Sequence, residues 1–209
     1  LTQVQSLEEG WRKAEAVNAV GLRLLDECAG QKQPWFLWVH YWDPHTPYLP
    51  PPPFNRMFYG GNEKDPANRS MDPVWKYDAF KDYFGAWMPG VTDVRFPDAQ
   101  YDAEIAYVDS VVERLLTRLE ELGRAEDTLV IVSSDHGEEL TEHGMWWDHH
   151  GLYETNLRVP LILKGPGIPS GVKLGGMVRH IDVAPTVLES VGFAGVAEEE
   201  GMQGRSLHP

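Results

Sequence analysis

The stretch "DAQYDAEIAYVDSVVERLLTRLEELG" (98–123) and the stretch "TLVIVS" (128–133) that follows it decide the fold class. In the first, apolar residues recur at steps of three and four, which predicts an amphipathic helix: Ile105, Val108, Val112, Leu115, Leu119 and Leu122. Asp98 is a candidate N-cap, and Gly123 directly follows the last periodic residue. The second stretch is short, apolar and rich in β-branched residues, which predicts a buried strand.

The alternation of helix and strand continues on both sides of these stretches. Upstream, the sequence predicts a helix over Ser6–Glu27 that Gly30 ends, then a strand buried on both faces over "PWFLWV" (34–39). Downstream it predicts a strand in "RVPLILKG" (158–165) that begins near Pro160, and a helix in "HIDVAPTVLESVG" (180–192). Asp182 is the candidate cap of that helix, and Gly192 its stop. The order predicts one α/β domain over residues 1–209, with a mostly parallel sheet between helices.

A proline- and aromatic-rich insertion over residues 46–97 interrupts this alternation. A connection of this length is unusual in a compact domain and is often functional, as a lid or a pocket wall. The alternative is a surface insertion that carries a short helix.

Composition narrows the function classes. The chain has 209 residues and a formal net charge of −14, which disfavours nucleic acid as a partner because phosphate backbones are repelled. No apolar run approaches the roughly 20 residues of a membrane span, and the first residues do not resemble a signal peptide. A secreted, periplasmic or cytoplasmic location and any oligomeric state all stay open. The single cysteine, Cys28, matches no thiol motif and is interpreted as a packed or surface thiol.

Chemistry-bearing residues gather directly after the strand over residues 128–133. Asp135 and His136 follow that strand, and ligand sites of open α/β sheets lie beyond the carboxyl ends of strands. Gly137 permits a tight turn away from the strand. A carboxylate beside an imidazole suits a divalent cation, with histidine extending the choice toward Mn²⁺ or Zn²⁺. Two protein ligands are too few for such a site, so further ligands must come from elsewhere.

Further histidines follow, at His143, His149 and His150. Imidazoles donate hydrogen bonds to anions and protonate leaving groups. His149 and His150 are the candidates for this role; the alternative is that they are ordinary surface histidines. Glu138, Glu139, Glu142 and His143 are interpreted as solvated residues that shape the loop.

A second candidate segment is "VHYWDPHTPY" (39–48), where His40 and His45 flank Asp43. Pro44 and Pro47 stiffen the backbone around His45, so its ring could be held toward a site. We expect this segment and the one at Asp135 to converge in space. The alternative is a rigid proline-rich loop whose histidines are incidental.

Several motifs, in this order, resemble the sulfatase family of the alkaline phosphatase superfamily: "FLWVHYWDPHTPY", "YDAEIAYVDSVVERLLTRLEELG…TLVIVSSDHGEELTEHG", "LYETNLRVPLILKGPG" and "HIDVAPTVLESVG". The resemblance spans about Ala14 to Leu207. It implies an α/β three-layer sandwich of the alkaline-phosphatase type. It also implies hydrolysis of a sulfate ester, with a sulfated small molecule or glycan as substrate.

The resemblance also implies residue roles. Family members hold one divalent cation, usually Ca²⁺, and Asp135 and His136 match the Asp-Asn or Asp-His pair among its ligands; Mn²⁺ is an alternative. His45 matches the histidine that contacts the sulfate group. His149 matches the residue that contacts the sulfate or the leaving oxygen, with His150 as a neighbouring alternative. The family nucleophile is a formylglycine made from cysteine in a C-x-P-S-R-like motif, or a serine in related enzymes.

This chain departs from the family pattern. It contains no C-x-P-S-R motif and none of the paired aspartates that open the family's first strand. The resemblance therefore implies the middle and later part of a catalytic domain, with the formylglycine in a missing N-terminal part. A phosphodiesterase or phosphonate monoester hydrolase of the same superfamily, and a catalytically inactive binding domain, are the alternatives.

We expect the 209-residue chain by itself to be inactive toward sulfate esters, because the nucleophile segment is absent. Arylsulfate hydrolysis by the purified chain with Ca²⁺ or Mn²⁺ measures this. Turnover by the chain above that of its Asp135→Asn variant would contradict the expectation.

Overall fold

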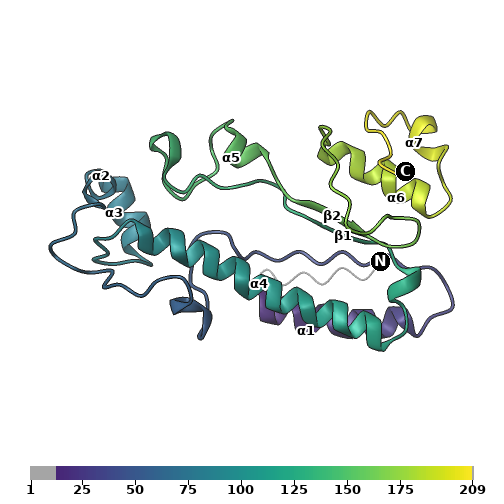
Figure 1. The fold of residues 1–209 in the computed structure, drawn as a ribbon, viewed down its shortest axis with the longest axis horizontal. Coiled ribbons are helices and arrows are strands. Elements are labelled where there is room, and N and C mark those ends of the chain that lie inside the picture. Colours follow the sequence, from purple (N-terminus) through teal and green to yellow (C-terminus); the bar gives the residue numbers. More distant parts are fainter. Residues whose placement is uncertain (1–12, 209) are drawn as a thin grey trace. The chain divides into compact units, whose positions relative to one another are not determined.

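The computed structural model describes residues 13–208, which form two compact units (Figure 1). The first unit comprises residues 13–123 and 139–148, and the second comprises residues 124–138 and 149–208. None of the described helices combines the length and the apolar composition needed to cross a bilayer.

Two long helices organise the first unit. Helix α1 (Ala14–Ala29) lies beside the C-terminal half of α4 (Arg95–Glu121), as Figure 1 shows. Arg114 of α4 pairs with Glu15 at 2.8 Å, and Arg118 pairs with Asp26 at 2.7 Å, so the two helices run in the same direction. Helix α1 ends at Gly30 as predicted. The predicted turns from Ser6 to Arg12 lie outside the described residues.

Helix α4 confirms the predicted helix but differs from it at its start. It begins at Arg95, so Asp98 lies inside the first turn and is not the N-cap. The Asp98 carboxylate instead accepts a hydrogen bond from the indole of Trp147 at 2.9 Å, a distant partner that local sequence does not reveal. Gly123 lies just past the helix end with φ +66°, as predicted.

The insertion forms an aromatic core. It contains the 3₁₀ turn η1 (Phe54–Arg56) and the short helices α2 (Asp72–Trp75) and α3 (Asp78–Gly85), and Figure 1 shows α2 and α3 near the N-terminal end of α4. Segment 139–148, with the turn η3 (Glu142–Gly144), contributes Trp147 to this core. The fully buried members are Tyr48, Met71, Val74, Phe84, Met88, Val91 and Trp147.

The prediction of a strand buried on both faces over residues 34–39 is wrong. The segment is not part of a sheet, and within residues 13–208 no backbone ladder pairs with it. Burial alternates along it: Phe36 and Trp38 are 70% and 75% exposed, whereas Val39 packs near Gly21 of α1. Two-residue alternation is a strand period, so one face is partly buried and the other is exposed. The apolar run alone did not distinguish a segment with one exposed face from a strand buried on both faces.

The sheet of the described chain lies in the second unit and has two strands, β1 (Val130–Ser133) and β2 (Leu161–Lys164). They pair antiparallel, with Val130 opposite Lys164 and Ser133 opposite Leu161. The predicted order of elements favours parallel pairing, but the pairing is antiparallel. The connection over residues 134–160 carries the turn η3 and one four-residue helix, which is shorter than the helix of a usual parallel crossover. Pro160 directly precedes β2, where its missing N–H costs no ladder bond.

Short helices complete the second unit. They are η2 (Ala125–Asp127), α5 (Glu154–Leu157), η4 (His180–Asp182), α6 (Val183–Ser190) and α7 (Val196–Glu199). Asp182 occupies the N-cap position of α6 as predicted, and Gly192 follows the helix with φ +89°. A helix-rich chain with a two-stranded sheet is compatible with an incomplete α/β domain.

The Trp147–Asp98 hydrogen bond generates a stability prediction. Trp147→Phe keeps the ring in the aromatic core but removes the donor, so unfolding should cost about 1–3 kcal/mol less. Burial raises the pKa of Asp98, and the indole N–H opposes that rise. The loss of stability should therefore be full where Asp98 is ionised and shrink as the pH falls and the carboxyl group is protonated.

Denaturant unfolding at several pH values measures this. Trp38→Phe, at an exposed tryptophan of the same unit, is the matched control and should change stability by no more than about 0.5 kcal/mol. Equal effects of the two substitutions would contradict the role given to the hydrogen bond.

Candidate functional site

The backbone after β1 is held by a close pairing within the second unit. The N–H of Gly137 donates to the carbonyl of Asn156 at 2.7 Å, and the N–H of Glu138 donates to the carbonyl of Thr155 at 3.1 Å. A Cβ at Gly137 would lie 1.9 Å from the Thr155 oxygen, so a side chain does not fit. Gly137 was expected to permit a tight turn; the structure shows instead that it permits this close approach of two backbones.

The ring of His136 has a defined tautomer. Its Nδ1 lies 2.7 Å from the carbonyl oxygen of Gly137, and because a carbonyl only accepts, Nδ1 carries the hydrogen. In the neutral ring, Nε2 therefore keeps its lone pair. Metal-binding histidines are oriented by this kind of hydrogen bond from the second ring nitrogen.

Asp135 completes the pair predicted from the sequence. One of its carboxylate oxygens lies 3.8 Å from His136 Nε2 and accepts the backbone N–H of His136 at 3.1 Å. The Asp135 side chain is 76% exposed and that of His136 is 33% exposed. A carboxylate and an imidazole lone pair are thus presented together directly after the strand.

His149 lies against this pair. Its ring stacks on that of His136, with 4.0 Å between centroids and 24° between planes, and His150 follows at 5.6 Å from His149. Glu138, whose side chain is nearly buried, faces His149 with 3.7 Å between carboxylate oxygen and Nδ1. The structure therefore brings together the predicted Asp135, His136, His149 and His150.

Two acidic residues differ from the prediction that they are solvated. Glu138 is nearly buried beside His149, as described above. Glu139 belongs to the first unit, is fully buried, and lies 3.2 Å from Nδ1 of His143. Buried carboxylates take charged or hydrogen-bonding partners, and the neighbouring histidines fill that role here. Sequence reasoning missed Glu138 because an alternation of acids and histidines is also typical of a surface loop.

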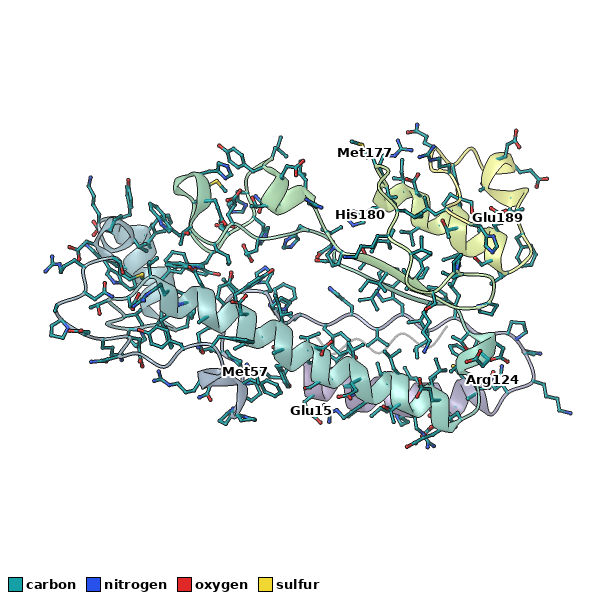
Figure 2. All side chains as sticks on the ribbon, in the orientation of Figure 1. Glu15, Met57, Arg124, Met177, His180 and Glu189 are labelled. Carbon is teal, nitrogen blue, oxygen red and sulfur yellow. The ribbon has the colours of Figure 1, made fainter. Side chains whose placement is uncertain are left out.

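His180 supports the same segment from the turn before α6. Its Nε2 donates to the carbonyl of Ser134 at 2.8 Å, and its ring is labelled in Figure 2. The Ser134 hydroxyl donates to the carbonyl of His136. The backbone that carries Asp135 and His136 is therefore hydrogen-bonded on both sides of the pair.

His45 lies in the first unit, on the loop after the extended segment. Its Nδ1 lies 2.8 Å from the carbonyl of Thr46 and so carries a hydrogen. The ring packs on Trp42 with 4.4 Å between centroids, and the hydroxyl of Thr46 hydrogen-bonds that of Tyr83 at 2.9 Å. The loop is ordered by these contacts. The convergence of His45 with Asp135 stays a prediction.

Within residues 13–208, no group of three or more His, Cys, Asp or Glu side chains is arranged to hold a metal ion. The fit of a cation to this chain rests on two donors, the Asp135 carboxylate and His136 Nε2. The carboxylate oxygen suits either Ca²⁺ or Mn²⁺. The imidazole nitrogen suits Mn²⁺ better than Ca²⁺.

Comparison with known proteins identifies the family of the chain. The family profile described as Sulfatase matches residues 13–193. The chain belongs to the sulfatase family. It is 33% identical to a Sulf-1 homologue of Caenorhabditis elegans described as an extracellular sulfatase, over 84% of this chain and 24% of that protein. It is 31% identical to the choline-sulfatase of Rhizobium meliloti, over 81% of this chain and 33% of that protein.

A solved structure has a similar fold. The phosphonate monoester hydrolase of Silicibacter pomeroyi superposes with a TM-score of 0.73 at 26% identity, over 95% of this chain and 42% of that one. Its fold is alkaline-phosphatase-like, which supports the α/β class expected from the sequence. The chain spans less than half the length of each of these relatives.

The close approach at Gly137 generates a prediction. Gly137→Ala must push the Thr155 backbone away, so unfolding should cost about 1–3 kcal/mol less. The displaced backbone should also shift the His136 and His149 ring resonances. Chemical denaturation and histidine NMR spectra measure both effects.

Gly176→Ala is the control, because a Cβ at Gly176 meets no atom within 4 Å. It should leave the stability within about 0.5 kcal/mol and the histidine spectra unchanged. Wild-type spectra in the Gly137→Ala variant would contradict the role given to this pairing.

Proposed function

We propose that this chain is a portion of the catalytic domain of a sulfuric ester hydrolase that depends on one divalent cation. Membership of the sulfatase family supports the reaction class. The observation that carries the site assignment is the His136 ring, whose Nδ1–H is held by Gly137 so that Nε2 is left beside the Asp135 carboxylate. Asp135 and His136 would then hold the cation, with Ca²⁺ or Mn²⁺ as the candidates.

The cation, when bound, polarises the oxygens of the sulfate group and offsets the charge that develops on them. The ligands beyond Asp135 and His136, and the formylglycine nucleophile, belong to segments that this chain does not contain. We also propose that the complete catalytic domain is a three-layer sandwich with a larger, mostly parallel sheet. The insertion over residues 46–97 would form a wall of the substrate pocket.

His149 is proposed as the proton donor to the leaving oxygen. The Glu138 carboxylate lies 3.7 Å from its Nδ1 and so faces the ring on that side. The ring stacked on His136 is fixed in orientation, and an oriented acid near the bond that breaks accelerates the reaction. His150 is the neighbouring alternative for this role.

His45 is proposed to contact the sulfate group. Because its Nδ1–H is directed at the Thr46 carbonyl, the neutral ring presents only an acceptor at Nε2. A hydrogen bond from Nε2 to an anion therefore requires a second hydrogen on the ring. Its contribution is that of one directional donor.

A phosphonate monoester or phosphodiester hydrolase is the second candidate. The similarity to the phosphonate monoester hydrolase of Silicibacter pomeroyi favours it, and both substrate types present a tetrahedral anion. Rates with an aryl sulfate and with an aryl phosphonate or phosphate diester, compared on the complete catalytic domain, distinguish the two. A dominant sulfate rate supports the first candidate, and a dominant phosphorus-ester rate supports the second.

Substitutions in a complete catalytic domain that contains this chain should show graded effects. Asp135→Asn should lower kcat/KM by roughly a hundredfold or more, because the carboxylate supplies both a ligand and a charge. His45→Ala removes one donor and should cost about ten- to a hundredfold, measured with the same chromogenic substrate.

Asp102→Asn, at an exposed carboxylate of α4, is the matched control and should leave the rate unchanged. Near-normal turnover by Asp135→Asn would exclude the metal assignment. A greater loss for His45→Ala than for Asp135→Asn would reverse the proposed ranking.

A further inference from the structure

Two carboxyl groups of the first unit hold the loop that carries His45. At the start of the loop, the Asp43 carboxylate accepts the backbone N–H of Ala14, the first residue of α1, at 2.8 Å. At its end, Glu104 of α4 accepts the backbone N–H of Leu49 at 2.8 Å. The loop over residues 43–49 is thus hydrogen-bonded to α1 at its first residue and to α4 at its last residue.

The second carboxylate oxygen of Glu104 is buried in a way that bears on its protonation. Glu104 is 1% exposed, and its Oε2 is buried with no donor among the described residues to hydrogen-bond it. The Asp43 carboxyl group lies close enough to hydrogen-bond Glu104, and the Lys13 ammonium group is also near. A buried carboxylate oxygen without a donor is costly, and two adjacent carboxylates repel each other. One proton placed between them removes both costs, because Glu104 then donates to Asp43.

We propose that Asp43 and Glu104 share one proton and that this acid pair positions the loop that presents His45. Both residues are positioning residues, since neither would contact the substrate. The inference rests on the proposed function for the role of His45. The shared proton and its effect on the loop can be tested without any activity.

The surrounding charges are consistent with a shared proton. Lys13 is the nearby cation, and its Nζ is directed at the Leu49 carbonyl at 2.8 Å. On α1, Glu15 is paired with Arg114, and on α4 the Tyr107 hydroxyl accepts the N–H of Glu15 at 3.0 Å. Burial, followed by the charge of Asp43, raises the pKa of Glu104 to about 7, and Lys13 opposes the rise only in part.

The sign of the pH effect follows from this raised pKa. Below the ordinary carboxyl value of 4.5, Glu104 is protonated in both folded and unfolded chains and contributes no pH dependence. Between 4.5 and about 7 the unfolded chain loses this proton and the folded chain keeps it, so stability falls as the pH rises. Above about 7 the folded pair is ionised as well, and the repulsion should loosen the loop.

Backbone-amide NMR of the 209-residue chain, with thermal melting, tests the proposal across pH 4.5 to 8.5. Imidazoles titrate in the same range, so the readout is a comparison with Glu104→Gln. Glutamine accepts the Leu49 N–H and donates to Asp43 at every pH, as the protonated acid does. We expect the Leu49 and Thr46 amides to shift with a midpoint near pH 7 in the wild type and not in Glu104→Gln.

The melting temperature of Glu104→Gln should rise relative to the wild type by several degrees as the pH increases across this range, on the scale of about 2–4 °C for each kcal/mol in a chain of this size. Glu113→Gln, at an exposed glutamate of the same helix, is the matched control and should titrate like the wild type. If Glu104→Gln does not fold, Asp43→Asn serves instead, since it keeps the acceptor for Ala14 and should also remove the midpoint near pH 7.

The result that overturns the proposal is a wild-type Leu49 amide without a transition near pH 7, or a transition that persists unchanged in Glu104→Gln and Asp43→Asn. These outcomes are independent of whether a complete enzyme hydrolyses sulfate esters. If the loop titrates as expected but the complete enzyme does not hydrolyse sulfate esters, only the proposed function is excluded.

Discussion

The candidate site depends on the backbone pairing of residues 137–138 with residues 155–156. This pairing brings Gly137 so close to Thr155 that a side chain is excluded, and it fixes the Gly137 carbonyl that orients the His136 ring. The tautomer of His136 follows from that carbonyl, and the ring held in this way stacks on His149. Short side chains after a strand make a precise site only when the backbone beneath them is held in this way.

Several carboxylates of this acidic chain are buried and form hydrogen bonds that stabilise the structure. Asp93 is buried against Arg95 and Tyr59, and the Arg95 hydrogen bonds hold its pKa at about 2. Backbone donors from Arg205 and Arg179 lower the pKa of Asp182 in the second unit. Glu104 is the opposite case, since burial and a like charge raise its pKa. The net charge alone indicates none of this, because it does not distinguish solvated acids from acids that bind backbone.

The sequence predicted the elements with strong periodicity and short-range signals. The long helix ending before Gly123 and the helix after Asp182 are confirmed. The strand after residue 128 is confirmed as a strand, but its second half is exposed rather than buried. The rings of His136 and His149 lie together, and their function stays a prediction. What it did not predict depends on distant partners: Asp98 is engaged by Trp147, the segment at residues 34–39 has one exposed face, and Glu138 is buried against His149. Local patterns contain no information on such contacts.

We propose that Asp135 and His136 present a carboxylate and an imidazole nitrogen to a divalent cation. A titration of the chain with Mn²⁺, followed in long-range ¹H–¹⁵N spectra of the histidine rings, tests it most directly. The account predicts His136 as the Nδ1–H tautomer before the metal is added, and paramagnetic broadening that reaches His136 and His149 first and is lost in Asp135→Asn. An Nε2–H tautomer of His136, or a His136 signal that stays sharp while other histidines broaden, would contradict it.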